Sequence, residues 1–557
     1  MSVPASTAVP AVPADSLLDW RQIVAAVPEA EMTPLVRFLL HVIEQLEAKV
    51  SSLEAEIVRL KGGPSQKPPA SNSKPSELSK PAKPATDDGK RPGSAKRSKT
   101  EDLPIHSEVA VPPSELPPGS SLVRRDPFVV QDLIVEAYNT RYQIETWRTL
   151  NGEEIRGRLP AGIRGHFGAG LVRFVMQQHY AAHVPQSRIF EELADFGIDI
   201  SAGQVNNILT AKVDDFHAEK DALLPTALHA CPVLNVDDSG APHEGKYGSC
   251  LCLCNEFFTS FHSSDSKERG KFLDVLRCGH RDYVLDEHSG KYLLVQGLPA
   301  KIGKLFAAEP PPDSTAEPTI RPQTFANEAA WNQHLDRLGI DNAKHRQTLT
   351  EAALLGSAIS HGLPTDLKLV SDGSTIYALF VHGLCWIHQE RNLAKLVPCG
   401  AEQVRAHESV LTVLWQLYQD LKAYREKPTA ELAAELRTRF DALASQTTRW
   451  PELDAALSKM AKKKDDLLRV LDHPELPLHT NAAERGFRDW ATKRKISAGT
   501  RSEGGRRCRD TFLSLKSTCR KLGVRFWSYL NDRLMKANTI PQLSELLVQK
   551  SASSATI

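Results

Sequence analysis

Apolar residues repeat every seven positions early in the chain. Leucine takes one position of the repeat and β-branched residues take the complementary one; the set is Leu39, Ile43, Leu46, Val50, Leu53, Ile57 and Leu60. This arrangement favours a parallel two-stranded coiled coil. We therefore expect residues 31–62, which follow a tail and short helix at 1–30, to dimerise the protein. An amphipathic helix packed on its own chain is the alternative.

The sequence changes character after the heptads, at Gly62, Gly63 and Pro64. Residues 63–124 are rich in proline, serine and lysine, which predicts a linker. From Lys61 to Lys99 there are ten Lys or Arg against three acidic residues, an excess that attracts phosphate. In a leucine-zipper transcription factor the basic region precedes the zipper as a continuous helix. Here it follows the zipper and contains prolines, which argues against that class.

Two segments with different periodicities come next. Residues 125–160 include the β-branched and aromatic run Phe128–Trp147 and predict a small β segment. Residues 161–220 predict helices, the last of which begins after Ser201 as its N-cap. The spacing suits a helix-turn-helix whose last helix would bring Gln204 and Asn207 near DNA. A helical bundle without a DNA-binding role is an equally good interpretation, because this helix carries little positive charge.

Three acidic residues lie at the ends of predicted strands or helices. Asp237 and Asp372 each end an apolar strand, and Glu484 lies at the start of a helix. Carboxylates suit Mg²⁺, a hard cation that prefers oxygen ligands. Two such ions about 3.5–4 Å apart can activate an attacking oxygen and stabilise a leaving one in phosphodiester cleavage. For Glu484 the alternatives are a capping box with Asn481 and an i,i+4 pair with Arg488.

Five motifs make the sequence similar to the transposases of insertion-sequence family sixty-six. They are NVDDS with Asp237, SDGSTIY with Asp372, LCWIHQERNL, TNAAERGFR with Glu484, and AGTRSEGGRRC. The resemblance implies a metal-dependent DNA transposase of the Asp-Asp-Glu superfamily, which cleaves element ends and transfers strands to target DNA. It also implies a ribonuclease-H-like mixed sheet in which these three acids are catalytic and hold two Mg²⁺ ions, replaceable by Mn²⁺.

The resemblance places this catalytic domain at residues 221–500 of a multidomain α/β protein. The acids are separated by 372 − 237 = 135 and 484 − 372 = 112 residues, more than a compact core needs. We therefore expect insertions at about 280–364 and 401–470, the second almost entirely helical. A C-terminal helical region is expected at 501–557.

The cysteines are not expected to bind metal. Related transposases carry a cysteine-rich zinc ribbon before the helix-turn-helix, but residues 128–159 contain no cysteine, so no zinc is expected there. Cys250, Cys252 and Cys254 alternate along a predicted strand, as small buried hydrophobic residues do. Four residues beside the motif acids are expected to support the site: Asp238, Cys385, His388 and Asn481.

Basic residues gather after Glu484. Residues 488–520 contain ten Lys or Arg against three acidic residues. Beside a phosphodiester-cutting site such side chains are expected to contact the DNA backbone, although a solvated helix face has a similar composition. The expected contact residues are Arg485, Arg488, Lys493, Arg494, Lys495, Arg501, Arg506 and Arg507.

Composition narrows the class of protein. The 557 residues are 41% hydrophobic and 25% charged with a net charge of +1, so nucleic-acid binding must come from local patches. There is no apolar run of about 18 residues and no secretion signal, which predicts a cytoplasmic protein rather than a membrane protein. The family resemblance implies that it is bacterial and is associated with the nucleoid when bound to DNA. Expected partners are double-stranded DNA (terminal repeats and target), further copies of the chain as a homodimer or higher assembly, and accessory proteins of the same element.

Two other functions remain compatible with the sequence. One is a catalytically inactive or repurposed transposase that acts as a dimeric DNA-binding protein, and the intact set of acids argues against it. The other is a ribonuclease-H-like nuclease acting on another nucleic acid, which would need neither the zipper nor the helix-turn-helix.

Overall fold

The computed structural model of the chain describes residues 33, 36–37, 40–46, 49, 103–115, 117–231, 233–306 and 320–555. Its contacts divide the chain into two compact units. The first contains Met1–Lys80 and Ile387–Lys464, and the second contains Pro81–Trp386 and Asp465–Ile557. The three acidic candidates all lie in the second unit.

The predicted coiled coil belongs to the first unit and lies mostly outside the described residues. Those outside are Leu39, Val50, Leu53, Ile57 and Leu60. Ile43 and Leu46 lie in described helical residues, and they are 42% and 56% exposed. Exposed apolar residues at heptad spacing are compatible with pairing to another chain. Dimerisation stays a prediction.

The remainder of the first unit is helical. Its helices are α12 (Trp386–Ala394), α13 (Ala401–Glu426), α14 (Ala430–Ala444) and α15 (Pro451–Ala461), followed in the second unit by α16 (Lys464–Leu467) and the short helix η5 (Arg469–Leu471). The predicted helical character of residues 401–470 is confirmed. Even the 26-residue α13 is not apolar enough to cross a membrane, and the same holds for every other described helix.

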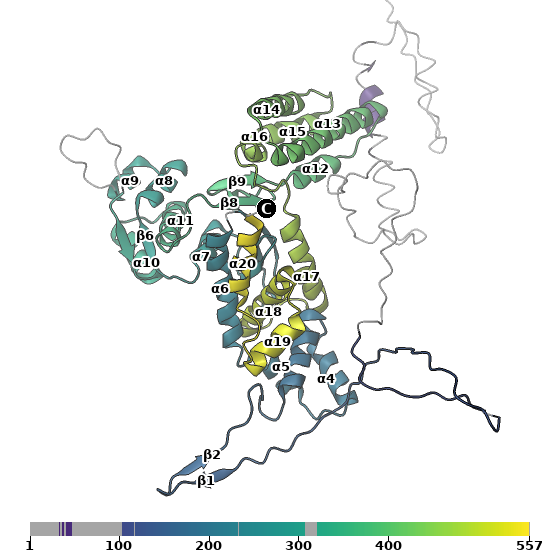
Figure 1. Cartoon of the computed structure of the whole chain (residues 1–557). Helices are drawn as coiled ribbons and strands as arrows, with labels where there is room; N and C mark the ends of the chain where they lie inside the picture. Colours follow the sequence, from purple (N-terminus) through teal and green to yellow (C-terminus); the bar gives the residue numbers. More distant parts are fainter. Residues whose placement is uncertain are drawn as a thin grey trace, which may run out of the picture. The chain divides into compact units, whose positions relative to one another are not determined.

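The second unit contains a five-stranded mixed sheet (Figure 1). Its strands are β3 (Val233–Gly240), β4 (Ser249–Cys254), β5 (Thr259–Ser264), β8 (Lys368–Ser371) and β9 (Val381–Leu384). They lie in the order β5-β4-β3-β8-β9; β3, β4 and β5 pair antiparallel, whereas β8 is parallel to both β3 and β9. The predicted mixed α/β fold is confirmed, including the strands that carry Asp237 and precede Asp372.

Each face of this sheet has its own apolar core, because successive side chains of a strand point to opposite faces. Leu234 and Val236 of β3 belong to a large cluster that includes residues of α7 (Arg269–Leu276) and α11 (Ala343–Ser360). On the other face, Cys250, Cys252 and Cys254 pack with Ala483, Phe487 and Trp490 of α17 (Asn481–Ser497). Helix α17 therefore covers one face of the sheet.

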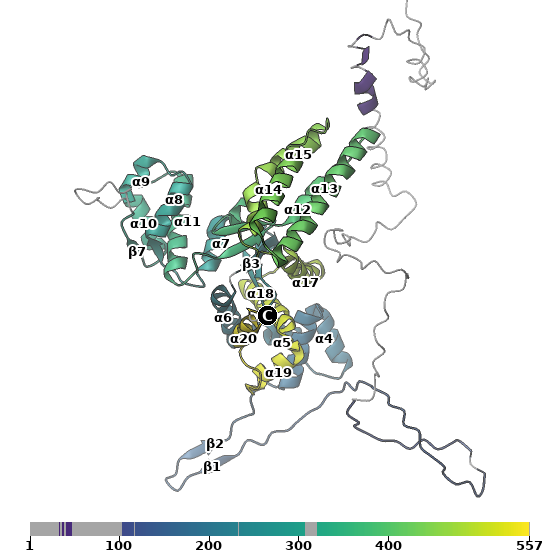
Figure 2. The same ribbon diagram turned by 45° about the horizontal axis from the view of Figure 1, so that its top comes forward.

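Helices from two distant parts of the sequence share a further core. They are α3 (Ala169–Met176), η3 (Gln177–Ala181), α4 (Gln186–Asp195), α5 (Ala202–Thr210) and α6 (Asp214–Ala230), with α18 (Glu503–Leu522), α19 (Phe526–Met535) and α20 (Leu543–Ala555). Figures 1 and 2 show α6 and α18 side by side, and Tyr180 stacks on Phe512 with ring centroids 4.3 Å apart. The predicted C-terminal helical region thus completes the core of the predicted 161–220 region.

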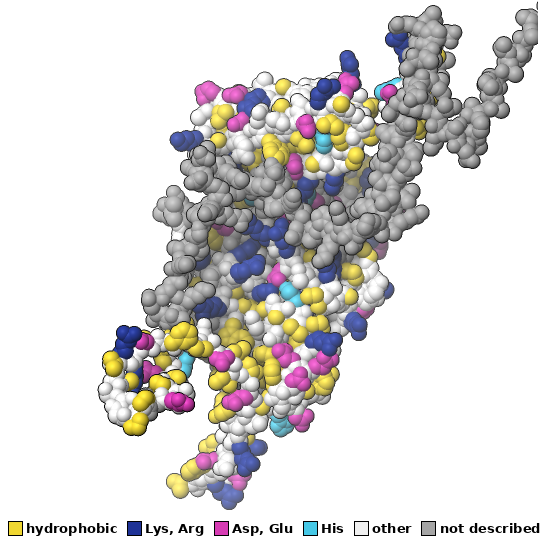
Figure 3. All heavy atoms as spheres, turned by 90° about the vertical axis from the view of Figure 1, so that its right-hand side faces the viewer, with side chains coloured by type: hydrophobic (Ala, Val, Ile, Leu, Met, Phe, Trp, Pro, Cys, Tyr) yellow, Lys and Arg dark blue, Asp and Glu magenta, His cyan; other side chains and the backbone are white. Residues whose placement is uncertain are grey.

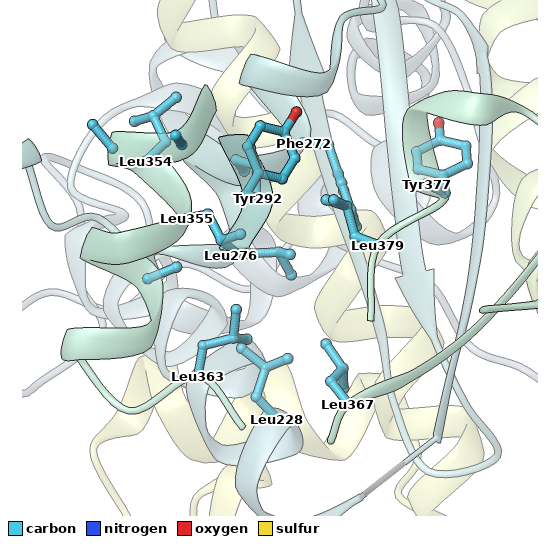
Figure 4. Packing of buried hydrophobic residues seen from close by; sticks show 14 of the residues in the cluster. Leu228, Phe272, Leu276, Tyr292, Leu354, Leu355, Leu363, Leu367, Tyr377 and Leu379 are labelled. Carbon is cyan, nitrogen blue, oxygen red and sulfur yellow. The ribbon is translucent and has the colours of Figure 1, made fainter. Parts of the chain in front are cut away.

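An α-rich segment lies between β5 and β8. It contains α7, β6 (Tyr283–Leu285), α8 (Glu287–Val295), α9 (Ala300–Phe306), β7 (Gln323–Phe325), α10 (Glu328–Arg337) and α11. Figure 4 shows Leu354 and Leu355 of α11 close to Leu276 of α7 and Tyr292 of α8, all within the large cluster. This segment corresponds to the insertion expected at about 280–364.

Gly356 marks a close approach between α11 and β6. A Cβ atom there would lie 2.1 Å from the carbonyl oxygen of Val284 and 2.5 Å from Oγ of Ser289. Gly356→Ala is expected to lower the free energy of unfolding by about 1–3 kcal/mol, as overpacking does. Gly303→Ala in α9 is the control, because nothing lies within 4 Å of its added methyl group. Urea unfolding measures both variants, and an unchanged midpoint for Gly356→Ala would contradict the close packing.

The prediction of a β segment around Phe128–Trp147 is wrong for most of that range. Residues 128–145 form no strand, and Phe128, Leu133 and Tyr138 are 81–89% exposed. Strand propensity stabilises a strand only when its side chains pack on a neighbour, and these side chains have none within the described ranges. A short antiparallel hairpin, β1 (Thr146–Arg148) with β2 (Glu154–Arg156), is what forms instead.

Candidate active site

Asp237 and Asp238 are adjacent in β3 but point to opposite faces of the sheet. Asp237 pairs across the sheet with Cys252, whose face is covered by α17. Asp238 lies on the other face, where its Oδ2 accepts hydrogen bonds from the hydroxyl of Tyr377 (2.6 Å) and Nζ of Lys267 (2.7 Å). Of the two neighbours, Asp237 therefore shares a face with the helix that carries Glu484.

Asp372 immediately follows β8. The last paired residues of β3 and β8 are Asn235 and Val370. Asp237 comes two residues after Asn235, and Asp372 comes two residues after Val370. Because side chains alternate with a period of two, both aspartates lie on the α17 face. Oδ1 of Asp372 accepts a hydrogen bond from the backbone N–H of Ser374 (3.1 Å), so the turn after β8 orients this carboxylate.

Glu484 lies in the first turn of α17 and is partly buried. The helix begins at Asn481 after Thr480, which is the N-cap, and the side chain of Thr480 makes no capping hydrogen bond. The backbone N–H of Glu484 donates to the carbonyl of Thr480 (3.1 Å). The proposed capping box with Asn481 is therefore wrong, because Asn481 is already helical. Negative charge at this helix end is favourable.

The three acids interact electrostatically. Burial raises the pKa of Asp237 to about 7, and the negative charges of Asp372, Asp238 and Glu484 raise it too. The backbone N–H of Asp238, which donates to Oδ1 of Asp237 (2.8 Å), acts in the opposite direction. A cation among these carboxylates would offset the repulsion that disfavours the charged form of Asp237.

Cys385 and Trp386 make hydrogen bonds to both motifs that carry Asp372 and Glu484. The backbone N–H of Cys385 donates to the carbonyl of Ser371 (2.9 Å), next to Asp372. The backbone N–H of Thr480, the N-cap of α17, lies 3.4 Å from Sγ of Cys385. The neighbouring Trp386 N–H donates to the carbonyl of Leu478 (2.9 Å). Cys385 therefore contacts both the residue before Asp372 and the N-cap of α17, and its supporting role stays a prediction.

The other predicted supporting and cysteine residues have different surroundings. His388 belongs to the first unit, so its supporting role stays a prediction. Cys250, Cys252 and Cys254 are fully buried against α17. Burial raises the pKa of the Cys250 thiol well above its usual range, which keeps this thiol protonated.

The predicted DNA-contact residues differ in exposure. Those of α17, α18 and their connection with exposed side chains are Arg485, Arg488, Lys495, Arg501 and Arg507. Figure 3 looks onto the side where α17 lies in Figure 1, and Lys and Arg side chains gather near the middle of that view. On α5, Gln204 and Asn207 are exposed, whereas Val205, Ile208 and Leu209 are buried. These exposed side chains are sterically available to a ligand.

Three of the predicted DNA contacts are at least partly buried and are engaged within the protein. Lys493 is only 3% exposed, and its Nζ donates to the carbonyl of His179 (2.9 Å), so the structure does not offer it to DNA. Arg494 donates to Oγ of Ser239 (3.2 Å) and to the carbonyl of Gly240 at the end of β3. Arg506 is partly buried between Asp265 and Glu503. A count of basic residues cannot separate such structural side chains from free ones.

Lys267 and Tyr377 are the site residues that sequence reasoning missed. Burial lowers the pKa of Lys267, but its bond to Asp238 and the charges of Asp372 and Asp237 raise it overall, so the ammonium stays charged beside the acids. Tyr377 could have been found, because it lies five residues after Asp372 in the SDGSTIY motif. Lys267 belongs to none of the five motifs, so nothing in the sequence pointed to it as a site residue.

Comparisons with known proteins show the family of the chain. A sequence model described as "Transposase IS66 family" matches residues 343–507, the part that includes Asp372 and Glu484. The chain is 38% identical over 332 residues to the uncharacterized protein y4jO of Sinorhizobium fredii (strain NBRC 101917 / NGR234), covering 59% of this chain and all of that protein. It is 26% identical over 163 residues to y4qI of the same strain, covering 27% of this chain and 30% of that protein. With a family match at residues 343–507 and full coverage of a related protein, the chain belongs to the IS66 transposase family.

Proposed function

We propose that the protein is a metal-dependent DNA transposase that cleaves the ends of its element and joins them to target DNA. The observation that carries this proposal is the meeting of Asp237, Asp372 and Glu484 on the α17 face of one sheet. Family membership supports action on DNA. The proposal adds the chemistry, the metal ions and the residue roles.

The strand order supports a ribonuclease-H-like catalytic core. Three antiparallel strands are followed by two strands parallel to the first, in the order β5-β4-β3-β8-β9. In that arrangement the first strand is central, so Asp237 lies beside the strand that leads to Asp372. The α-rich segment between β5 and β8 and the helices between α12 and α17 are then insertions that leave this order intact.

The donor set fits Mg²⁺, with Mn²⁺ as a substitute. Asp237, Asp372 and Glu484 offer carboxylate oxygens, the ligands that hard divalent cations prefer. Burial and, to a smaller extent, repulsion by the neighbouring acids raise the pKa of Asp237, and a cation between the carboxylates would offset that repulsion. When bound, two ions supply activation of the attacking oxygen and stabilisation of the leaving oxygen. The chain's own part is to place three carboxylates and to keep Lys267 charged beside them.

DNA recognition is assigned to two exposed sets of side chains. The first is α5, as the last helix of a helix-turn-helix, with Gln204 and Asn207 facing outward. The second is the exposed basic group Arg485, Arg488, Lys495, Arg501 and Arg507, suited to phosphate contacts. Pairing of two protomers through the heptad segment would bring two element ends together.

A dimeric DNA-binding protein without catalytic activity is the second candidate. The absence of cysteine from residues 128–159, where related transposases have a zinc ribbon, favours it. In this chain the corresponding hairpin β1–β2 is short and exposed. A protein that has lost part of its end-recognition region could retain binding without cleavage.

Strand cleavage and joining on labelled DNA that carries the element's terminal repeats distinguishes the two candidates. With Mg²⁺ or Mn²⁺, the wild-type protein is expected to nick at the repeat end and to form joined products. EDTA is expected to abolish both. Specific binding of the repeats without cleavage in either metal would overturn the proposal and support the binding protein.

A further inference from the structure

We propose that His280, Asp282 and His361 form a binding site for a zinc-class divalent ion, separate from the three carboxylates of the sheet. A nitrogen of each histidine and a carboxylate oxygen of Asp282 all lie within 4.8 Å of one another. Nε2 of His361 is 2.9 Å from Oδ2 and 3.0 Å from Oδ1 of Asp282. No other such group is present in the described part of the chain.

These distances are close to those of a metal centre. Zinc binds imidazole nitrogen and carboxylate oxygen at about 2.0–2.2 Å, which puts tetrahedral ligand atoms about 3.4 Å apart. The ligand atoms must therefore move closer together by side-chain adjustment to reach this spacing. Two histidines and one carboxylate leave a fourth position for water, and His280 and His361 are exposed enough for an ion to enter.

The three residues come from two anchored segments. His280 and Asp282 lie in the connection between α7 and β6, and His361 is the C-cap of α11. Buried Leu276 and Tyr283 flank the first segment. Figure 4 shows Leu363, two residues beyond His361, beside Leu228 of α6 in the buried cluster. Both segments are thus held by buried residues, although Asp282 and His361 are 79 residues apart in sequence.

Neighbouring groups hold the carboxylate and the backbone of Asp282. Oγ of the buried Ser357 donates to Oδ1 of Asp282 (2.9 Å). Nη1 of Arg277 donates to the backbone carbonyl of Asp282 (3.0 Å). Such outer hydrogen bonds fix metal ligands and strengthen their binding. The C-terminal end of α11 is the negative end of the helix dipole, which also favours a cation at this position.

One adjustment is required for all three residues to bind one ion. The rings of His280 and His361 stack nearly parallel, with centroids 3.5 Å apart and an angle of 7°. A shared ion must lie near the plane of both rings, so the exposed His280 ring has to rotate. Without an ion, the stack and the Asp282–His361 hydrogen bond account for the arrangement as an ordinary surface cluster, and that is the competing explanation.

The donor set separates this site from the catalytic one. Imidazole ligands suit zinc and neighbouring transition metals, whereas carboxylates alone suit Mg²⁺. An ion here would fasten the α7–β6 connection to the end of α11. Its role is therefore to stabilise the segment between β5 and β8.

The test measures Zn²⁺ binding to full-length, metal-free protein by competition with a chromophoric chelator. An Asp372→Asn background removes one of the three sheet carboxylates, so that zinc at that site does not obscure the result. In this background we expect one zinc ion per chain and a higher melting temperature with zinc. Co²⁺ is expected to give the intense visible absorption of a tetrahedral site.

Variants assign the ion to the three residues. His361→Ala and, separately, His280→Ala are expected to weaken zinc binding by at least about tenfold. His280 is exposed, so its replacement leaves the core intact. His288→Ala in α8, in the same segment, is the matched control and is expected to bind zinc as the parent does. Equal zinc affinity in the parent and in both cluster variants, or no zinc binding by the parent, would overturn the proposal.

Discussion

Glu484→Gln is expected to reduce the rate of strand cleavage by about a thousandfold or more, because ligand loss removes several kcal/mol of transition-state stabilisation. The substitution keeps the size of the side chain and its place in the first turn of α17. The cost in folding stability is expected to be small, about 0.3–1 kcal/mol from the lost charge at the helix N-terminus. Single-turnover cleavage of labelled terminal-repeat DNA measures the rate.

Glu545→Gln is the matched control for this variant. Glu545 is also the acidic residue in the first turn of its helix, α20, and it is exposed. The control loses the same helix-end charge and is expected to cleave at the wild-type rate. Wild-type cleavage by Glu484→Gln, with Mg²⁺ as the metal, would remove Glu484 from the catalytic set.

Asp237→Asn is expected to stabilise the metal-free protein at neutral and higher pH. The pKa of Asp237 is raised from 3.8 to about 7. Between these values the folded protein holds a proton that the unfolded chain has released, so the free energy of unfolding falls as pH rises from about 4 to 7. The full difference is at most about 4 kcal/mol. Asparagine does not titrate, so the Asp237→Asn protein does not lose this part of the free energy of unfolding as pH rises.

Urea unfolding of metal-free protein between pH 5 and 8 measures the effect. The advantage of Asp237→Asn over wild type is expected to grow with pH and to level off above about pH 7. Asp366→Asn, which changes an exposed aspartate in the turn before β8, is expected to follow the wild-type curve. Added Mg²⁺ is expected to stabilise wild type and not Asp237→Asn. A constant difference across this pH range would contradict the buried, charge-crowded position of Asp237.

The strands and the helix that carry the three acids could be predicted from the sequence. Apolar strands before Asp237 and Asp372 and a helix starting near Glu484 follow from local pattern, and the structure has them. Alternation along β3 also predicts that Asp237 and Asp238 face opposite ways. Which of the two faces α17 depends on the pairing of β3 with β4 and on the packing of α17, and these contacts are far apart in sequence.

Burial and long-range partners could not be read from the sequence. Lys493 and Arg488 look alike in a basic run, yet Lys493 is buried on His179 and Arg488 is exposed. The run at 128–145 has strand propensity, but propensity does not supply a packing partner. Asp282 meets His361 only because the end of α11 packs beside the α7–β6 connection. Each of these outcomes is decided by tertiary contacts.

The most direct test of the central claim is to locate bound ions in crystals of the full-length protein grown with Mn²⁺ and terminal-repeat DNA, using anomalous diffraction. The account predicts anomalous peaks in contact with the carboxylates of Asp237, Asp372 and Glu484, on the α17 face of the sheet. Their loss is expected in crystals of Asp372→Asn. Well-defined Mn²⁺ peaks elsewhere on the protein, with none at these three acids in the presence of DNA, would contradict the assignment of the active site.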